Sequence, residues 1–325
     1  MRFRRSRRIT AFGGAIALLA CALAGCTGPA ASGQASPAGQ ELTHVNVGVL
    51  PIIDDAPVYV ALQHGLFDAH GLDVTPVTLN SGEQATQELL SGQLQFTFSN
   101  YVSTILAASQ GAQLRVVADA AQALPDAHDL VVARNSPIRS VTQLRGKIIA
   151  VNATGNIGTL MTDATLRAWG VPVNSVRYKV VPFPDMAAAL TAHTVDAAWM
   201  AEPFITEAGE QIGAVELADT ASGSMANFPI SGYATLRSYA LSNPSVIAEF
   251  TAALTQAQAM SSNRSVLQQA IATYVNGITP AEVAALQPEQ FPAALNQAML
   301  QRVADAMLSQ GLLTRPFNVG QLLSQ

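Results

Sequence analysis

From residue 45 onwards, short runs of β-branched and apolar residues alternate with longer segments in which apolar residues recur every three or four positions. The short runs predict strands at 45–49, 72–78, 95–98, 114–118, 130–134, 147–151, 176–181, 197–200 and 215–218. The longer segments predict helices at 57–69, 84–91, 101–110, 159–169, 186–192 and 203–212. Strands that alternate with helices in this way indicate an α/β protein with largely parallel sheets.

Glycines and capping residues mark the ends of several of these elements. Gly71 and Gly170 follow predicted helices, at the position where a left-handed cap is favoured. After Tyr239 the strand pattern stops and only helical spacing continues. There, Thr279 and Glu282 have the spacing of a capping box, in which each side chain accepts a bond from the other residue's backbone N–H. We therefore predict a C-terminal helical segment.

Two stretches about 100 residues apart repeat one plan of helix, turn, strand and helix. Residues 89–98 pass from helix to strand, and another helix opens after Ser99 and Asn100. Residues 189–199 do the same, and a helix opens at Glu202 and Pro203. The repeat predicts two similarly built lobes rather than one large sheet, which agrees with a length suited to two domains of about 150 residues.

The N-terminal segment has the pattern of an export signal. Five arginines fall within residues 1–8, and residues 9–23 carry no charge. This apolar run is shorter than the roughly 20 residues that span a bilayer. It ends in Leu23-Ala24-Gly25-Cys26, which resembles the bacterial lipobox and predicts cleavage before Cys26 with diacylglycerol on its thiol. An ordinary small-residue cleavage site is the alternative, and both Sec and twin-arginine export remain open.

Composition changes once the predicted signal of residues 1–25 is removed. The mature chain keeps all 22 acidic residues and 12 of the 17 Lys and Arg, which gives a net charge of −10. Such an acidic chain is not expected to bind nucleic acid, or a membrane other than through its lipid. Cys21 leaves with the signal and Cys26 carries lipid, so no thiol remains for a disulfide or a metal. Residues 26–43 are rich in Gly, Ala, Ser and Gln and predict a flexible tether.

No motif for catalysis or metal binding stands out. The five histidines are scattered without ligand spacing, and we interpret most of them as surface or structural residues. No Gly-x-Ser-x-Gly nucleophile elbow occurs. We therefore expect no catalytic residues, no cofactor and no metal site, although a dispersed acid/base pair stays open.

Polar residues follow the predicted strands where helices begin, which is where open α/β sheets bind ligands. As candidate ligand-binding residues we select Asp54, Asp55, Tyr59, Asn80, Ser81, Gly82, Ser99, Asn100, Tyr101, Thr154, Asn156, Ile157, Thr159, Glu202 and Phe204. For any single loop, the alternative is that the polar residues only cap helices and the aromatic ones lie in the core. We assign Trp169 and Trp199 to the core.

Six segments carry a resemblance to a known family. They are Ala56-Pro57-Val58-Tyr59-Val60-Ala61, Gly65-Leu66-Phe67, His70-Gly71-Leu72-Asp73-Val74, Leu144-Arg145-Gly146-Lys147-Ile148-Ile149-Ala150-Val151, Val181-Pro182-Phe183-Pro184-Asp185-Met186, and Val195-Asp196-Ala197-Ala198-Trp199 with Glu202-Pro203-Phe204. Together they resemble the solute-binding proteins of the nitrate, sulfonate and taurine ABC importers, including relatives that bind a thiamine-pyrimidine precursor. Gln95 departs from the family's aspartate, and we expect this change to affect packing rather than binding.

The resemblance implies a periplasmic-binding-protein fold of type II, with two α/β lobes, a hinge and a central ligand cleft. We expect the crossings between the lobes near 134–137 and 229–236. Lobe 1 is then discontinuous, with residues 44–135 and 230–325, and lobe 2 covers 136–229. Closure of both lobes around the ligand would control recognition by the importer.

The implied function is that of an extracytoplasmic solute-binding lipoprotein, anchored to the outer face of the cytoplasmic membrane or on the periplasmic side. We expect a monomer, with an ABC permease and its ATPase as partners. The solute is sulfonate- or taurine-like, or pyrimidine-like, because Asp54 or Asp55 would suit an ammonium or ring-amine donor. Alternatively, both aspartates cap the next helix or face water. An enzyme on the same frame and a ligand-sensing protein are the competing functions.

Overall fold

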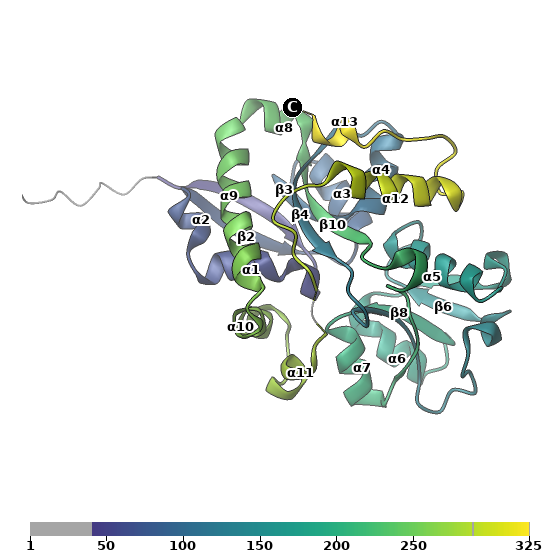
Figure 1. The fold of residues 1–325 in the computed structure, drawn as a ribbon. Helices are drawn as coiled ribbons and strands as arrows, with labels where there is room; N and C mark the ends of the chain where they lie inside the picture. The colour runs from purple at the N-terminus through teal and green to yellow at the C-terminus, as the bar shows by residue number, and fades with distance from the viewer. Residues whose placement is uncertain (1–40, 288, 325) are drawn as a thin grey trace, which may run out of the picture. The chain divides into compact units, whose positions relative to one another are not determined.

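Two five-stranded sheets organise residues 41–287 and 289–324, the part of the chain that this computed structural model describes (Figure 1). The first sheet has the strand order β2-β1-β3-β10-β4 and the second has β7-β6-β8-β5-β9. The predicted signal, Cys26 and most of the predicted tether lie outside the described residues. Within the described part, no helix is long and apolar enough to cross a membrane.

The strands agree closely in position with the nine that the sequence predicts, and one more is present. Their bounds are β1 Thr43–Val49, β2 Leu72–Thr78, β3 Phe96–Asn100, β4 Leu114–Gln122, β5 His128–Val132, β6 Ile148–Val151, β7 Arg177–Val180, β8 Ala197–Ala201, β9 Val215–Asp219 and β10 Pro229–Leu236. The additional strand, β10, fills the segment that we expected to be a crossing.

The sheets are mixed, so the prediction of largely parallel sheets is wrong in part. β1 pairs in parallel with β2 and β3, and β6 pairs in parallel with β7 and β8. β10 lies antiparallel between β3 and β4, while β5 lies antiparallel between β8 and β9. The reason is that each antiparallel strand follows a crossing from the other lobe, and therefore enters its sheet from the opposite end.

The crossings also lie earlier along the chain than we expected. Because β4 belongs to the first sheet and β5 to the second, the chain crosses at residues 123–127 rather than near 134–137. It returns at residues 220–228, between β9 and β10, rather than within 229–236. The apolar run of β5 suited either lobe, so its sequence alone did not assign it.

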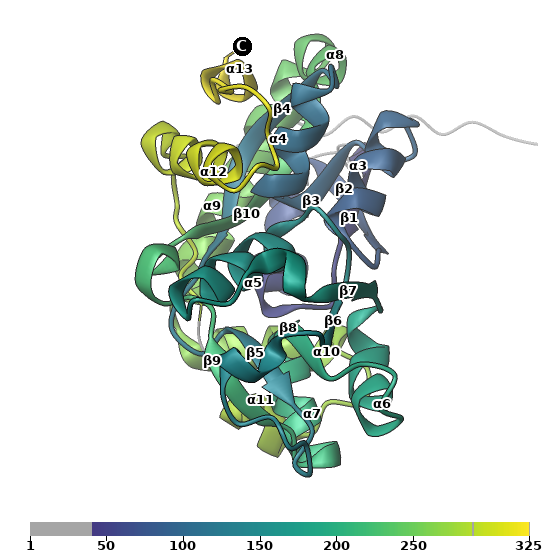
Figure 2. The ribbon, with the colours of Figure 1, turned by 90° about the vertical axis from the view of Figure 1, so that its right-hand side faces the viewer.

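Helices flank both sheets (Figures 1 and 2). Their bounds are α1 Ala56–Gln63, α2 Leu66–Ala69, α3 Gly82–Leu90, α4 Tyr101–Ser109, α5 Ile157–Ala168, α6 Met186–Thr191, α7 Phe204–Ile212, α8 Arg237–Ser242, α9 Pro244–Ser261, α10 Arg264–Tyr274, α11 Pro280–Ala285, α12 Gln297–Ser309 and α13 Gly320–Leu323. The helix predicted at 57–69 is interrupted at Gly65, which has a φ of 62°. The C-terminal helical segment and the capping box of Thr279 and Glu282 are confirmed. α9 packs against α1 and α2, so this segment joins the first lobe.

The internal repeat predicted from the sequence is present in both lobes. α3, β3 and α4 follow one another in the first lobe as α6, β8 and α7 do in the second. The turn after the first helix of each set uses a left-handed residue, Gly92 with φ 81° and His193 with φ 53°. The two sheets also share one strand plan, so the prediction of two similarly built lobes is confirmed.

Gln95 and Asp196 occupy matching places in this repeat, each just before the central strand of its sheet. Gln95 Oε1 accepts a bond of 2.8 Å from the Asn46 backbone N–H, and Asp196 Oδ2 accepts one of 2.9 Å from the Ile148 N–H. Both bonds tie the start of the central strand to the neighbouring strand. The amide of Gln95 therefore makes the same kind of bond in the first lobe as the carboxylate of Asp196 makes in the second. Its role is in the structure of the sheet.

Replacing Asp196 by alanine is expected to lower the free energy of unfolding by about 1–3 kcal/mol, because the part-buried Ile148 N–H loses its acceptor. Gln95→Ala should have a similar effect in the first lobe. Asp185→Ala is the control, since this exposed residue caps α6 without a side-chain bond and should change stability by less than about 0.5 kcal/mol. Urea titrations followed by circular dichroism would measure the differences; equal stability of the Asp185 and Asp196 variants would contradict the assignment.

Candidate ligand-binding site

A small cavity of about 20 Å³, with room for about one water molecule, lies between the two lobes, where strands of both sheets end. Its lining from the first lobe is Leu50, Ile52, Asp54, Phe98, Asn100 and Ile230, and its lining from the second is His128, Asn152, Ile157, Phe183, Trp199 and Ala201. Asn100 and Asn156 begin α4 and α5 at this edge, so the N-termini of two long helices point towards the cavity region. The arrangement is that of a ligand cleft in a closed state.

Aromatic rings form the wall of the second lobe. The Trp199 ring lies 6.0 Å from Phe183 and 5.5 Å from the His128 ring, centroid to centroid, and the latter pair is stacked. Trp199 Nε1–H donates a bond of 3.0 Å to Thr220 Oγ1, which fixes the indole. Trp199 is buried as expected, but it lines the cavity as well. The assignment of Trp169 to the core is wrong, because 53% of this residue is exposed at the end of α5.

Three asparagines supply amide groups from both lobes. Asn100 Oδ1 caps α4 by accepting a bond of 2.9 Å from the Ser103 N–H. Asn152 Nδ2 donates across the cleft to the Asn80 carbonyl at 3.4 Å, and Asn152 Oδ1 accepts from Asn156 Nδ2 at 2.8 Å. The Asn152 to Asn80 bond joins the two lobes directly, so it reports on closure of the cleft.

The two neighbouring aspartates have different surroundings, although both are fully buried and neither side chain makes a capping bond to α1. Asp55 accepts bonds of 2.7 Å from the Leu50 N–H and from the Tyr233 hydroxyl, so its carboxylate is held inside the first lobe. Asp54 lines the cavity; its Oδ2 accepts from Ser231 Oγ at 3.1 Å, while Oδ1 has no hydrogen-bond partner. Burial raises the pKa of Asp54 to about 7. Asp54 is therefore the carboxyl that a ligand can reach.

Several predicted residues support the cavity from behind. Ser81 caps α3 by accepting from the Gln84 N–H, and Ser99 Oγ donates to the Gly82 carbonyl. Gly82 approaches Asn100 so closely that a Cβ there would lie 2.5 Å from Asn100 Nδ2. Thr159 forms a reciprocal capping box with Asn156, which positions the loop of the second lobe. Of the predicted residues, the structure brings Asp54, Asn100 and Ile157 to the cavity wall.

The remaining predicted residues lie away from the cavity wall. Tyr59 stacks on Tyr274 with ring centroids 3.8 Å apart, and the Tyr101 hydroxyl donates to Asp119. Phe204 stacks on Phe183 at 5.5 Å, one layer behind the wall. Thr154 and Asn80 are exposed. The three aromatic residues are held in the packing of their lobes, which the loop pattern did not reveal.

Glu202 joins the second lobe to the segment after α11. Its Oε2 accepts a bond of 3.1 Å from the Thr206 N–H, and its Oε1 accepts from Thr206 Oγ1 at 2.8 Å and from the Gln287 N–H at 3.2 Å. Burial raises the pKa of Glu202, and these bonds lower it. With both oxygens engaged, Glu202 has a structural role at this junction.

Sequence reasoning missed most of the apolar lining and His128. Leu50, Ile52 and Ile230 read as ordinary core residues, and Phe98 is the end of an apolar strand. His128 begins β5, which we had placed two residues later and in the other lobe. Among the lining residues there is no Lys or Arg. The candidates Thr154, Asn156, Ile157 and Thr159 pointed to the loop after β6, but they did not include its lining residue Asn152.

The fold and the cleft define a class of protein. Two α/β lobes of one strand plan, joined by two crossings and enclosing a cavity between them, make up the fold of periplasmic binding proteins. The chain belongs to the NMT1/THI5-like family, whose sequence model matches residues 53–265. The family resemblance to the nitrate and sulfonate solute-binding proteins is thereby confirmed.

Named relatives and solved structures agree with this class. The chain is 26% identical over 257 residues to the Escherichia coli protein named "Putative aliphatic sulfonates-binding protein", covering 77% of this chain and 78% of the relative. It is 28% identical over 194 residues to the riboflavin-binding protein RibY of Chloroflexus aurantiacus, covering 56% and 54%. The alkanesulfonate-binding protein SsuA of Xanthomonas axonopodis bound to MOPS superposes with a TM-score of 0.75, at 22% identity, over 87% of this chain and 98% of that one.

Proposed function

We propose that this protein is the extracytoplasmic solute-binding component of an ABC importer, held at the membrane by lipid on Cys26. The observation that carries the proposal is the cavity enclosed by residues of both lobes. A solute that contacts both walls stabilises the closed state, and a permease with its ATPase can distinguish this state from the empty one. Sulfonate- and riboflavin-binding relatives at 26% and 28% identity support solute capture rather than catalysis.

The chemistry of the residues that line the cavity favours a small, flat, nitrogen-containing ring, such as an aminopyrimidine, which would enter when the lobes separate. Trp199 and Phe183 offer ring faces for stacking, and Asn100 and Asn152 offer amide donors and acceptors. The free Oδ1 of Asp54 can accept a bond from an amino group or a ring N–H. With this carboxyl and no Lys or Arg in the lining, the site disfavours a simple anion.

A taurine-like solute is the second candidate, because its ammonium could meet Asp54. Its sulfonate would then lie at the N-termini of α4 and α5, whose free N–H groups bind anions without a basic side chain. The sulfonate-binding relative supports this alternative. Both candidates require a donor for Asp54, and they differ in whether stacking or anion binding dominates.

A solute screen is expected to show an aminopyrimidine binding more tightly than taurine, and taurine more tightly than nitrate or an alkanesulfonate without an amino group. Calorimetry and thermal shift at pH 8 with EDTA would measure this, since a bound ligand raises the melting temperature. Chromatography of the solute after incubation should recover it unchanged.

Variants of two asparagines make the screen specific to the cleft. Asn152→Ala removes a lining amide and the bond between the lobes, so it should weaken binding by roughly tenfold or more. Asn174→Ala is the matched control, because Asn174 is exposed in the second lobe. A preference for nitrate, or equal affinity in the two variants, would refute the proposed site.

A further inference from the structure

Three side chains that no sequence motif connects meet at the base of the cleft. Asp54 follows β1, His128 begins β5, and Glu289 lies in the segment after α11. Each offers one oxygen or nitrogen atom, and these atoms all lie within 4.8 Å of one another. Because the residues come from three distant parts of the chain, the scattered histidine pattern gave no sign of this cluster.

The cluster is buried and poorly satisfied. His128 is 1% exposed, and the side chains of Asp54 and Glu289 are fully covered. His128 Nε2 lies 3.8 Å from Asp54 Oδ1, and Nδ1 lies 3.2 Å from Glu289 Oε1. Nevertheless Asp54 Oδ1, His128 Nδ1 and both oxygens of Glu289 make no hydrogen bond with the described residues. Buried polar atoms in this condition are costly and call for a partner.

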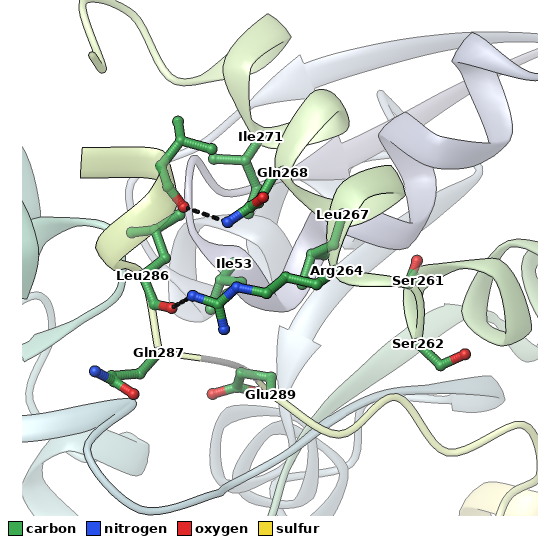
Figure 3. A pocket seen from close by; sticks show the side chains of 11 residues that line it. Ile53, Ser261, Ser262, Arg264, Leu267, Gln268, Ile271, Leu286, Gln287 and Glu289 are labelled. Atoms are coloured by element: carbon green, nitrogen blue, oxygen red, sulfur yellow. Dashed lines mark hydrogen bonds between the residues drawn. The ribbon is translucent and has the colours of Figure 1, made fainter. Parts of the chain in front are cut away.

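The basic side chain of the pocket that Glu289 lines, Arg264, is already engaged. Arg264 Nη2 donates to the carbonyls of Ala284 and Leu286 at 2.9 and 3.0 Å, and no salt bridge joins it to Glu289 (Figure 3). Within residues 41–287 and 289–324, the salt bridges of the three clustered side chains are only with one another. When both carboxyls are ionised beside a neutral imidazole, the cluster carries a charge of −2, which a divalent cation would balance.

We propose that Asp54, His128 and Glu289 bind one divalent transition-metal ion of the zinc class. One imidazole nitrogen and two carboxylate oxygens form a donor set suited to such ions. Zinc bonds of about 2.0–2.2 Å at tetrahedral angles would place the ligand atoms about 3.4 Å apart. The observed spread of up to 4.8 Å therefore requires only a modest contraction of the three side chains.

Access to the cluster comes from two sides. Asp54 and His128 line the cleft cavity, whereas Glu289 lines a separate pocket between α10 and α11, together with Ile53 and Arg264 (Figure 3). The cluster thus separates the two spaces. An ion can reach Glu289 through the outer pocket while the lobes stay closed, and with three protein ligands it keeps a coordination position for a small donor on the cleft side.

The test uses residues 27–325, which contain the whole compact unit of residues 41–325 and neither cysteine. After EDTA treatment and desalting, calorimetry with Zn²⁺ and metal analysis after gel filtration should find one ion per chain. Co²⁺ in its place should give the visible absorption bands of a four- or five-coordinate ion. The titrations contain no organic solute, and the solute screen contains EDTA, so each proposal can fail without the other.

Matched variants decide whether the cluster is the site. His128→Gln and Glu289→Gln should each weaken Zn²⁺ binding by more than about 100-fold. The controls are His64→Gln, at an exposed histidine, and Asp126→Asn, in a second, partly exposed acidic cluster with Asp129 and Asp219. Circular dichroism checks that each variant is folded. If His128→Gln does not fold, the zinc affinity of Glu289→Gln decides the test. Absence of 1:1 binding, unchanged affinity in Glu289→Gln, or loss of binding in a control would overturn the proposal.

Discussion

Asp54→Asn is expected to stabilise the empty, metal-free protein at pH 8 and to leave its stability nearly unchanged at pH 4. Burial raises the pKa of Asp54 from 3.8 to about 7 in the folded protein. Below pH 3.8 the carboxyl is protonated in both states, so it adds no pH dependence. Between pH 4 and 7 the unfolded chain ionises while the folded chain keeps its proton, so stability falls as pH rises. Above pH 7 both states are ionised, and the free energy of unfolding does not fall further because of Asp54.

The rise in the pKa of Asp54 from 3.8 to about 7 corresponds to a gain of up to about 4 kcal/mol for the variant at pH 8, because each tenfold change in an acid constant is worth roughly 1.36 kcal/mol. Asparagine keeps an oxygen that can accept the Ser231 bond. Urea titrations from pH 4 to pH 8 with EDTA would measure the difference, with exposed Asp185→Asn as the control. If the variant is less stable than the wild type at pH 8, then Asp54 is held as a carboxylate by a charged His128.

The same substitution should remove zinc binding and lower the affinity for the solute. A residue whose replacement stabilises the empty protein while removing its ligands is kept for binding rather than for folding. Asp55 provides the contrast, because its carboxylate is engaged by Leu50 and Tyr233 and has no free oxygen for a ligand. The pair of neighbouring aspartates thus combines a structural residue and a binding residue.

Local sequence patterns predicted the elements of this fold well, because each depends on nearby residues. Strand runs, the capping box at Thr279 and the repeated helix-strand-helix plan follow from periodicity and hydrogen bonding within a few positions. The lobe membership of β5 and β10 depends on pairing between strands far apart in the chain. An apolar strand fits the centre of either sheet, so the crossings were misplaced.

The site was predicted less completely for a related reason. Polar loop residues such as Asn100 carry a local signal, because the residue that caps a helix also reaches the cleft. Trp199 and His128 carry none, since a buried ring in a strand looks like core whether or not a cavity lies beside it. Glu289 was invisible to motif searches because its partners lie about 160 and 235 residues away in the sequence.

Trp199→Ala should have the largest effect on stability among single changes in the cleft, at about 3–5 kcal/mol, because it removes a large buried side chain. It removes the ring contacts with His128 and Phe183 and the bond to Thr220. The chain's other tryptophan is the control. Trp169 is 53% exposed, so Trp169→Ala should change stability by less than about 0.5 kcal/mol.

Trp199→Phe tests the role of Trp199 in solute binding without the loss of stability expected for Trp199→Ala. Phenylalanine keeps an aromatic face and most of the packing, so the variant should fold and bind an aminopyrimidine within roughly tenfold of the wild-type affinity. A Trp169→Phe background leaves Trp199 as the sole indole, and its fluorescence should then change on titration with that solute. Taurine, which has no ring to stack, should bind Trp199→Phe and the wild type equally. If solute binding leaves the fluorescence of Trp199 unchanged, the solute does not lie against this wall, and stacking cannot be what selects it.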